Sequence, residues 1–82
     1  KLIFKGKVAV VTGGSGGIGL DVSKKLAKLN IKVLILDINP PKIRNKFIYF
    51  EQVDLSNENE INQAISKFIK KEKSIDYIVN AA

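Results

Sequence analysis

Residues 8–19 read VAVVTGGSGGIG, a short apolar run followed by a cluster of glycines. The run is continuous and mostly β-branched, which is typical of a strand buried on both faces, and we expect this strand to span Lys7–Thr12. After the glycines, apolar residues return at helical spacing with lysines on the opposite side, which predicts a helix from about Gly17 to Leu29. A strand, a glycine-rich turn and a helix therefore follow one another directly.

The rest of the chain continues this alternation. Three further apolar runs each predict a strand: Ile31–Asp37, Phe47–Val53 and Ile75–Asn80. The proline pair after Asn39 breaks regular structure and predicts a turn-rich crossing between the second and third strands. Asn57 stands three residues before Glu60, the spacing of a helix cap with a reciprocal carboxylate, and apolar residues at helical positions follow from Ile61 to Ile69.

This order of elements predicts one α/β domain. Strands joined by crossovers are expected to lie parallel in a doubly wound sheet, and we predict the strand order 3-2-1-4. A chain of 82 residues makes at most one small domain, and it buries only roughly 60% of the surface that it exposes when unfolded. Because the last predicted strand stops at Asn80 without a turn or cap, we expect residues 1–82 to be the N-terminal segment of a longer single-domain protein.

The composition narrows the classes of function. At 45% apolar and 27% charged residues, the chain resembles an ordinary globular protein rather than a disordered one. Cys and His are missing, which excludes Cys/His zinc sites, Ser-His-Asp hydrolysis and cysteine proteases within these residues, and we predict no metal site. The apolar runs are far shorter than the ~20 residues that cross a bilayer, so we expect a cytoplasmic protein without a membrane partner.

The net charge of +6 raises nucleic acids and anionic cofactors as partners. Thirteen of the 14 basic residues are lysines, whereas a surface that recognises bases is usually rich in arginine. The small groups in which these lysines occur fit solvated helix faces and helix carboxyl ends. We therefore favour an anionic cofactor and predict no binding of nucleic acid.

The glycine cluster lies where an anion would meet the free amides and the positive end of the first helix. For a pyrophosphate there, Gly13 can make the tight turn, Gly17 lets the backbone approach the phosphates, and Gly19 lets the helix lie close to the sheet. Ser15 could donate its hydroxyl to a phosphate or serve only as a turn residue. A triphosphate-binding loop is excluded, because Leu and Asp follow Gly19 where Lys and Ser or Thr are required. A purely structural turn is the alternative.

Asp37 closes the second predicted strand, 18 residues after Gly19. At about this distance an acidic side chain accepts hydrogen bonds from the adenosine ribose hydroxyls of a dinucleotide, and its charge would repel a 2′-phosphate. We therefore predict NAD rather than NADP as the cofactor. Lys42 and Arg44 are near enough in sequence to keep NADP open, and Asp37 could also merely begin the turn that follows.

With the loop and Asp37 in place, the chain resembles the NAD(P)-dependent short-chain dehydrogenases/reductases. The loop fits the family signature Thr-Gly-x-x-x-Gly-x-Gly through Thr12, Gly13, Gly17 and Gly19, with Ile18 at the usual hydrophobic position. The resemblance covers the whole chain. It implies a Rossmann-type doubly wound sheet and an NAD-dependent oxidoreductase that transfers a hydride between nicotinamide and an alcohol or carbonyl substrate. The alternative from another class is a dinucleotide-binding regulatory module without chemistry.

The resemblance implies further cofactor contacts. Asp54 and Leu55 look like the family's adenine-contacting pair, although Asp54 could instead help to cap the next helix. Asn80 looks like the start of the family's Asn-Asn-Ala-Gly element, whose first backbone position lies near the adenosine ribose. This sequence departs from that element, since Ala81 replaces the second Asn, whose side chain stabilises the fourth strand in the family. The predicted cofactor-binding residues are Gly13, Ser15, Gly17, Ile18, Gly19, Asp37, Asp54, Leu55 and Asn80.

The catalytic residues of the family have no match in this chain. They are a Tyr with a Lys four residues later and an upstream Ser. Tyr49 is followed at that spacing by Val53, and Tyr77 by Ala81. We therefore assign no catalytic residue and expect the catalytic half to lie beyond Ala82. Members of the family are commonly dimers or tetramers, which implies a homo-oligomer for the full-length protein.

Overall fold

A computed structural model describes residues 7–81, which form four strands and two helices. In chain order they are β1 (Val8–Thr12), α1 (Gly17–Lys28), β2 (Lys32–Asp37), β3 (Ile48–Gln52), α2 (Glu58–Glu72) and β4 (Tyr77–Asn80). Every predicted element is present, but each predicted strand is one or two residues too long at one end or both. Lys7, Phe47 and Asp76 lie just outside the strands, because each adds only a single backbone hydrogen bond to the end of the sheet.

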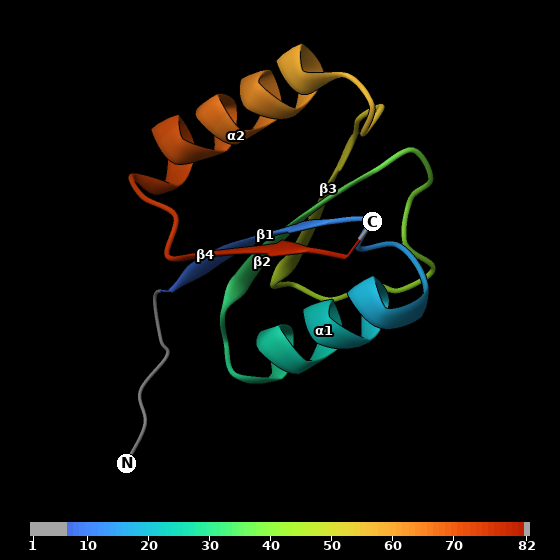
Figure 1. The fold of residues 1–82 in the computed structure, drawn as a ribbon. Helices are drawn as coiled ribbons and strands as arrows, with labels where there is room; N and C mark the ends of the chain where they lie inside the picture. Colours follow the sequence, from blue (N-terminus) through green and yellow to red (C-terminus); the bar gives the residue numbers. More distant parts are fainter. Residues whose placement is uncertain (1–6, 82) are drawn as a thin grey trace.

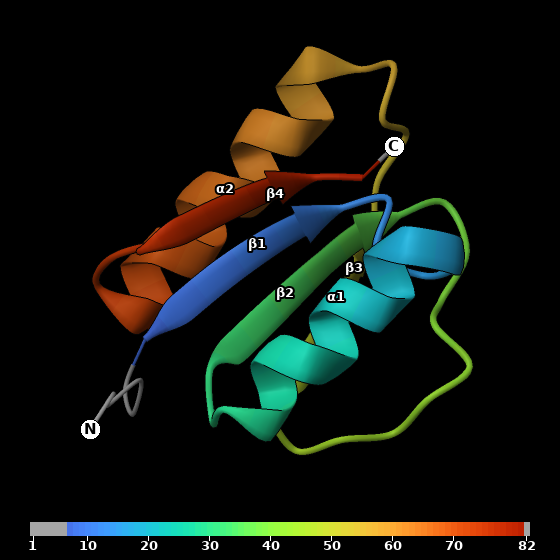
Figure 2. The ribbon, with the colours of Figure 1, turned by 60° about the horizontal axis from the view of Figure 1, so that its bottom comes forward.

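The four strands form one parallel sheet in the order β3-β2-β1-β4, which confirms the predicted order 3-2-1-4. Helix α1 covers one face of this sheet and α2 covers the other (Figure 1). The turned view in Figure 2 shows the strands side by side, with β1 between β4 and β2. This arrangement is the doubly wound α/β fold that the alternation of elements predicts.

The core consists of two apolar layers, one on each face of the sheet. The layer under α2 is built from Val8, Val10, Leu34, Leu36, Val53, Ala64 and Phe68. The layer under α1 is built from Ala9, Val11, Ile31, Val33 and Ile35. Residues 8–11 and 33–36 alternate between the two layers and are no more than 4% exposed. This burial on both faces explains why the two central strands are continuous apolar runs rather than alternating ones.

The crossing from β2 to β3 takes only residues 38–47, and in these ten residues the backbone forms turns and bends but no helix. Parallel strands are usually joined by a longer connection with a helix. Ten nearly extended residues can still reach roughly 33 Å, which is enough to return along β2. Pro40 and Pro41 have fixed φ angles and no backbone N–H to donate, which fits a crossing without regular structure, as the proline pair predicts.

Helix α2 begins at an N-cap, Asn57, whose side chain accepts a hydrogen bond from the Glu60 amide at 3.2 Å. The reciprocal carboxylate of Glu60 reaches further back than expected. Its Oε1 accepts from the Asp54 amide at 3.1 Å, because the Asn57 amide already donates to the Asp54 carbonyl. The helix therefore has both halves of the predicted cap, shifted so that they include the preceding turn.

Candidate functional site

The turn after β1 depends on glycine at two backbone positions. Gly13 has φ 74° and Gly17 has φ 54°, values in the left-handed region that side chains rarely allow. The amide of Gly13 donates to the carbonyl of Leu36 at 2.8 Å, so the turn is joined to β2 as soon as it leaves β1. A Cβ on Gly17 would meet nothing within 4 Å, so the backbone at this position is open to a ligand.

Gly19 allows the closest approach in the loop. A Cβ there would lie 2.1 Å from the carbonyl oxygen of Gly13 and 2.9 Å from the Gly14 Cα. The start of α1 therefore packs closely against the backbone that leads out of β1, rather than against side chains of the strands. Ile18, which lies between Gly17 and Gly19 in sequence, is 78% exposed.

Gly14 is a residue whose role the motif did not reveal. It is buried, and a Cβ there would lie 3.0 Å from two side-chain carbons of Ile35 and 3.1 Å from Val11. The layer of apolar side chains under α1 thus continues up to the backbone of the loop. The only signal in the sequence is a second glycine directly after the first, at a position that the signature leaves free.

The two helices begin in different ways. Helix α2 has a side-chain cap from Asn57 and two acidic residues, Glu58 and Glu60, in its first turn. Helix α1 starts after Gly16 with no side-chain cap among the described residues and no acidic residue in its first turn. The first amides of a helix have no partner within it, and they carry partial positive charge. The start of α1 therefore suits an anion, whereas that of α2 is occupied by the chain itself.

Asp37 ends β2 with its carboxylate against the glycine loop. One oxygen accepts from the Ser15 amide at 3.1 Å and the other from the Ile38 amide at 2.7 Å. The hydroxyl of Ser15 donates to the carbonyl of Asn39, so Ser15 is bonded to the start of the crossing through both its backbone and its side chain. Ser15 therefore lies in a turn that its own hydrogen bonds hold in place, and its contact with a phosphate stays a prediction.

A cleft of about 870 Å³ opens between the loop and the crossing. Ser15, Gly16 and Leu20 form one wall. The other wall is formed by Asp37, Asn39, Pro40, Pro41 and Lys42. An acidic residue, Asp37, and a basic residue, Lys42, therefore line the same space, together with the apolar Leu20.

Asp54 and Leu55 follow β3 but do not line this cleft. The Asp54 carboxylate accepts from the Ser56 hydroxyl at 2.7 Å and from the Ser56 amide at 3.0 Å. These two bonds hold the pKa of Asp54 below its ordinary value, so its anionic form is favoured. This turn leads into α2, but the N-cap of that helix is Asn57, and the Asp54 carboxylate bonds to Ser56 before the helix rather than to a helix amide. Leu55 packs against the apolar layer under α2.

Asn80 ends β4 next to the end of β1. The Thr12 hydroxyl donates to Asn80 Oδ1 at 3.0 Å, and the Ala81 amide donates to the Thr12 carbonyl at 2.9 Å. Thr12 thus joins the two strand ends. Ala82, the last residue of the expected motif, lies outside the described residues. A second cavity of about 360 Å³ on the α2 face is lined by Thr12, Leu55, Ile61, Ile65, Ile78 and Asn80.

The structure places four of the nine predicted site residues in two cavities. Ser15 and Asp37 meet in the cleft beside the start of α1, while Leu55 and Asn80 line the second cavity. All of them lie at the carboxyl ends of the strands, the edge where parallel α/β sheets bind ligands. Residues of the crossing complete the first cleft. Lys42 is one of the two basic residues that keep NADP open in the sequence, whereas Asn39, Pro40 and Pro41 were not predicted to line a site, because only contact in space shows that they do.

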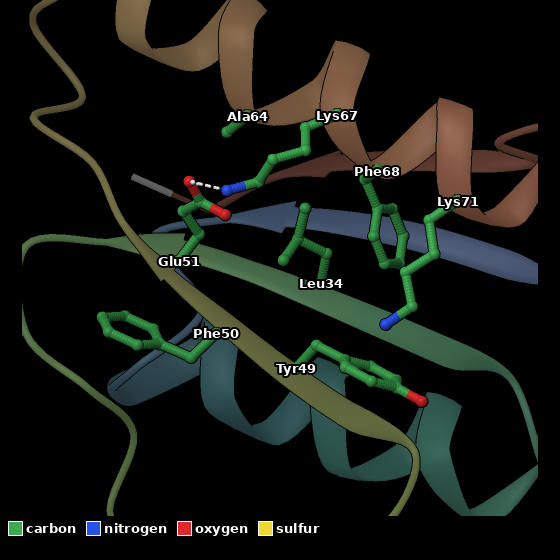
Figure 3. A pocket seen from close by; sticks show the side chains of 8 residues that line it. All are labelled: Leu34, Tyr49, Phe50, Glu51, Ala64, Lys67, Phe68 and Lys71. Carbon is green, nitrogen blue, oxygen red and sulfur yellow. Dashed lines mark hydrogen bonds and ion pairs between the residues drawn. The ribbon is translucent and has the colours of Figure 1, made fainter.

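Tyr49 has Lys71 beside it in space, although the family pattern requires a lysine four residues after the tyrosine in sequence. The Lys71 ammonium lies 4.5 Å from the centre of the Tyr49 ring, in a pocket of about 330 Å³ between β3 and α2 (Figure 3). Leu34 of β2 and Phe68 of α2 also line this pocket. An ion pair of 3.1 Å between Lys67 and Glu51 crosses one end of it. None of the residues lining this pocket lines the cleft beside the glycine loop.

Two features are absent from residues 7–81. Neither helix of this part of the chain combines the length and the apolar character that a membrane span requires. In the same residues, no three acidic side chains come together in a group that could hold a metal ion.

Comparison with known proteins accounts for this arrangement. A family profile described as short chain dehydrogenase matches residues 7–82. The chain belongs to the short chain dehydrogenase family. Family membership confirms the resemblance that the glycine signature predicts, and solved members of the family share the Rossmann-type fold of this chain.

Individual members of the short chain dehydrogenase family support the same assignment. Dehydrogenase RED2 of Cochliobolus heterostrophus is 34% identical over 79 residues, which cover 93% of this chain and 30% of that protein. A short chain dehydrogenase from Leptospira borgpetersenii, solved with bound NAD⁺, is 27% identical to this chain, with a TM-score of 0.86. The match covers 96% of this chain and 32% of the Leptospira chain. The aldohexose dehydrogenase of Thermoplasma acidophilum, solved in ligand-free form, is 30% identical to this chain, with a TM-score of 0.89. The match covers 96% of this chain and 30% of the Thermoplasma chain. The chain spans about a third of the length of these proteins.

Proposed function

We propose that residues 1–82 are the N-terminal NAD-binding segment of a longer single-domain oxidoreductase. The full-length enzyme would transfer a hydride between nicotinamide and an alcohol or carbonyl substrate, and we expect it to be a homo-oligomer. The observation that carries the proposal is the carboxylate of Asp37 at the carboxyl end of β2, directly beside the glycine loop. The Leptospira relative, solved with NAD⁺, supports a nicotinamide dinucleotide.

The residues of the cleft fit such a cofactor. The amides at the start of α1 have no side-chain cap, and the open backbone at Gly17 leaves room for a pyrophosphate against them. Each carboxylate oxygen of Asp37 accepts one amide hydrogen and has further lone pairs, so both can also accept from ribose hydroxyls. Gly13, Ser15, Gly17, Ile18 and Gly19 would hold the cofactor from the loop. Asp54, Leu55 and Asn80 would contact its adenosine half.

The choice between NAD and NADP depends on charge. A 2′-phosphate next to Asp37 would meet a carboxylate whose position is fixed by two amides, and we therefore favour NAD. Lys42 lines the same cleft, and this observation supports NADP as the second candidate. The bound cofactor would accept the hydride from an alcohol or supply it to a carbonyl, while this chain would hold and orient the cofactor.

The test is a fluorescence titration of the full-length protein with NADH and NADPH, for the wild type and Asp37→Ala. We expect the wild type to bind NADH more tightly, and we expect Asp37→Ala to weaken NADH binding by about tenfold while it favours NADPH in relative terms. Glu58→Ala, which removes an exposed carboxylate in the first turn of α2, is the control and should change neither affinity. Binding of neither nucleotide by the wild type would contradict the proposal. Binding without turnover of any alcohol or carbonyl substrate would favour the regulatory module.

A further inference from the structure

The wall of the cleft formed by the crossing is held at two consecutive carbonyl groups. The Asn39 carbonyl accepts from the Ser15 hydroxyl, which comes from the glycine loop. The Ile38 carbonyl accepts from Gln52 Nε2 at 3.3 Å, which comes from the end of β3. The segment between β2 and the prolines is thus tied on one side to the loop and on the other to the sheet.

These two bonds can be removed one at a time without a change at Asp37. The links from the amides of Ser15 and Ile38 have the Asp37 carboxylate as their acceptor, so removing them also removes the charge that Asp37 brings to the cleft. The side chains of Ser15 and Gln52 supply the remaining links. Without the side-chain bonds from Ser15 and Gln52, the bonds of the Asp37 carboxylate would hold the start of residues 38–42, and the chain that follows Pro41 would hold their end.

The tied segment carries the charges that distinguish the two dinucleotides. Asp37 begins it and Lys42 ends it, and both line the cleft. The carboxylate lies against the loop through the 3.1 Å bond from the Ser15 amide. The position of Lys42 depends on the path of the four residues between them. A change in that path alters how near Lys42 lies to a 2′-group of the ribose, while the Asp37 carboxylate stays bonded to the two amides.

We propose that Ser15 and Gln52 are positioning residues that set the preference for NAD over NADP by holding residues 38–42 in place. This inference rests on the proposed function, and it assigns Ser15 a role other than phosphate contact. The Ser15 hydroxyl has one hydrogen, which it donates to Asn39, while a phosphate offers only acceptors near neutral pH. Gln52 does not line the cleft, so its effect on cofactor choice acts through the segment.

The experiment measures dissociation constants for NADH and NADPH by fluorescence titration of the full-length protein. The variants are Ser15→Ala, Gln52→Ala, the double variant and Ser15→Thr, which keeps the hydroxyl. Ser66→Ala and Gln63→Ala make the same chemical changes on the exposed face of α2 and serve as matched controls. The measured quantity is the ratio of the NADPH constant to the NADH constant.

We expect this ratio to fall about 3- to 10-fold in Ser15→Ala and in Gln52→Ala, as loss of one hydrogen bond would allow. In the double variant the ratio should fall by less than the product of the two single-variant factors, because both bonds hold the same segment. Ser15→Thr and the two controls should keep the wild-type ratio.

Two results would overturn the inference. If Ser15→Ala weakens NADH and NADPH equally and Gln52→Ala has no effect, the hydroxyl contacts the phosphates directly. If both variants lower the melting temperature but leave the ratio unchanged, the two bonds serve stability alone. A wild-type protein that binds neither nucleotide would remove the proposed function as well, so the two failures are distinguishable.

Discussion

Gly19 lies so close to Gly13 that a single methyl group on the first would overlap the carbonyl oxygen of the second, at 2.1 Å. The helix therefore starts directly against the residue that makes the turn out of β1. Because the contact is between two backbones, no side-chain rotation can relieve an added methyl group. Glycine at position 19 is thus a requirement of packing in the free protein, before any ligand is considered.

Gly19→Ala should destabilise the protein by about 1–3 kcal/mol, the usual cost of forcing an extra carbon into a packed site. The control is Gly16→Ala, where a Cβ would meet nothing within 4 Å and the backbone is extended. That control should cost less than about 1 kcal/mol, since alanine is only a poorer N-cap than glycine. Urea denaturation of both variants measures the difference, and equal costs would show that the contact is not decisive.

Asn57→Ala should reduce the free energy of unfolding by about 1 kcal/mol, because it removes the side-chain acceptor at the start of α2. Asn62→Ala changes the same residue type on the exposed face of the same helix and should have little effect. Chemical denaturation followed by circular dichroism checks both. A loss as large in Asn62→Ala would mean that the effect is not specific to the cap, because helix propensity alone favours alanine over asparagine at that position.

Ser56→Ala should raise the pKa of Asp54 towards its ordinary value, since the Ser56 hydroxyl is the largest cause of the lowered pKa. A carboxyl whose pKa is lowered by folding stabilises the native state above the unfolded pKa, and this contribution is lost as the pH falls through the folded pKa. The variant should therefore lose stability relative to the wild type above about pH 4, and the difference should disappear in stronger acid. Carbon NMR titration of the Asp54 carboxyl measures the pKa, with Ser66→Ala as a control that should leave it unchanged.

Phe68→Ala should cost about 3–5 kcal/mol, because it empties a buried site between α2 and the sheet. The Phe68 ring lies 6.2 Å from that of Tyr49, so the variant also removes an aromatic contact at the edge of the sheet. Ile69→Ala removes a neighbouring apolar side chain that is 40% exposed and should cost much less. Similar costs in the two variants would place the core of this face elsewhere on α2.

The order of the elements and of the strands could be predicted because each depends on local features of the chain. The runs before Gly13 and after Asn30 are buried on both faces, which only the centre of a parallel sheet explains. Asn30 itself has φ 62°, a conformation that asparagine tolerates and that ends α1 where the periodicity stops. Strand ends were less accurate, because the last ladder bonds depend on neighbouring strands rather than on composition.

The candidate site could be predicted only in part. The glycines and Asp37 follow from a motif whose spacing reflects backbone geometry, so they were found in sequence. The bond from Ser15 to Asn39 depends on how the crossing turns after Asp37, and no local pattern fixes that path. The tight packing of Gly14 against Ile35 likewise appears only when β1 and β2 lie side by side.

The pairing of β1 with both neighbours has a consequence for the order in which the protein is made. Thr12 and its partner Asn80 are 68 positions apart, whereas β2 follows β1 after a single helix. At roughly 5–20 residues per second, a ribosome needs on the order of 3–14 s between the two strands. During that interval one edge of β1 can pair only with other chains. The newborn chain is therefore most exposed to aggregation just before β4 is added, and this is the interval in which a chaperone would protect it.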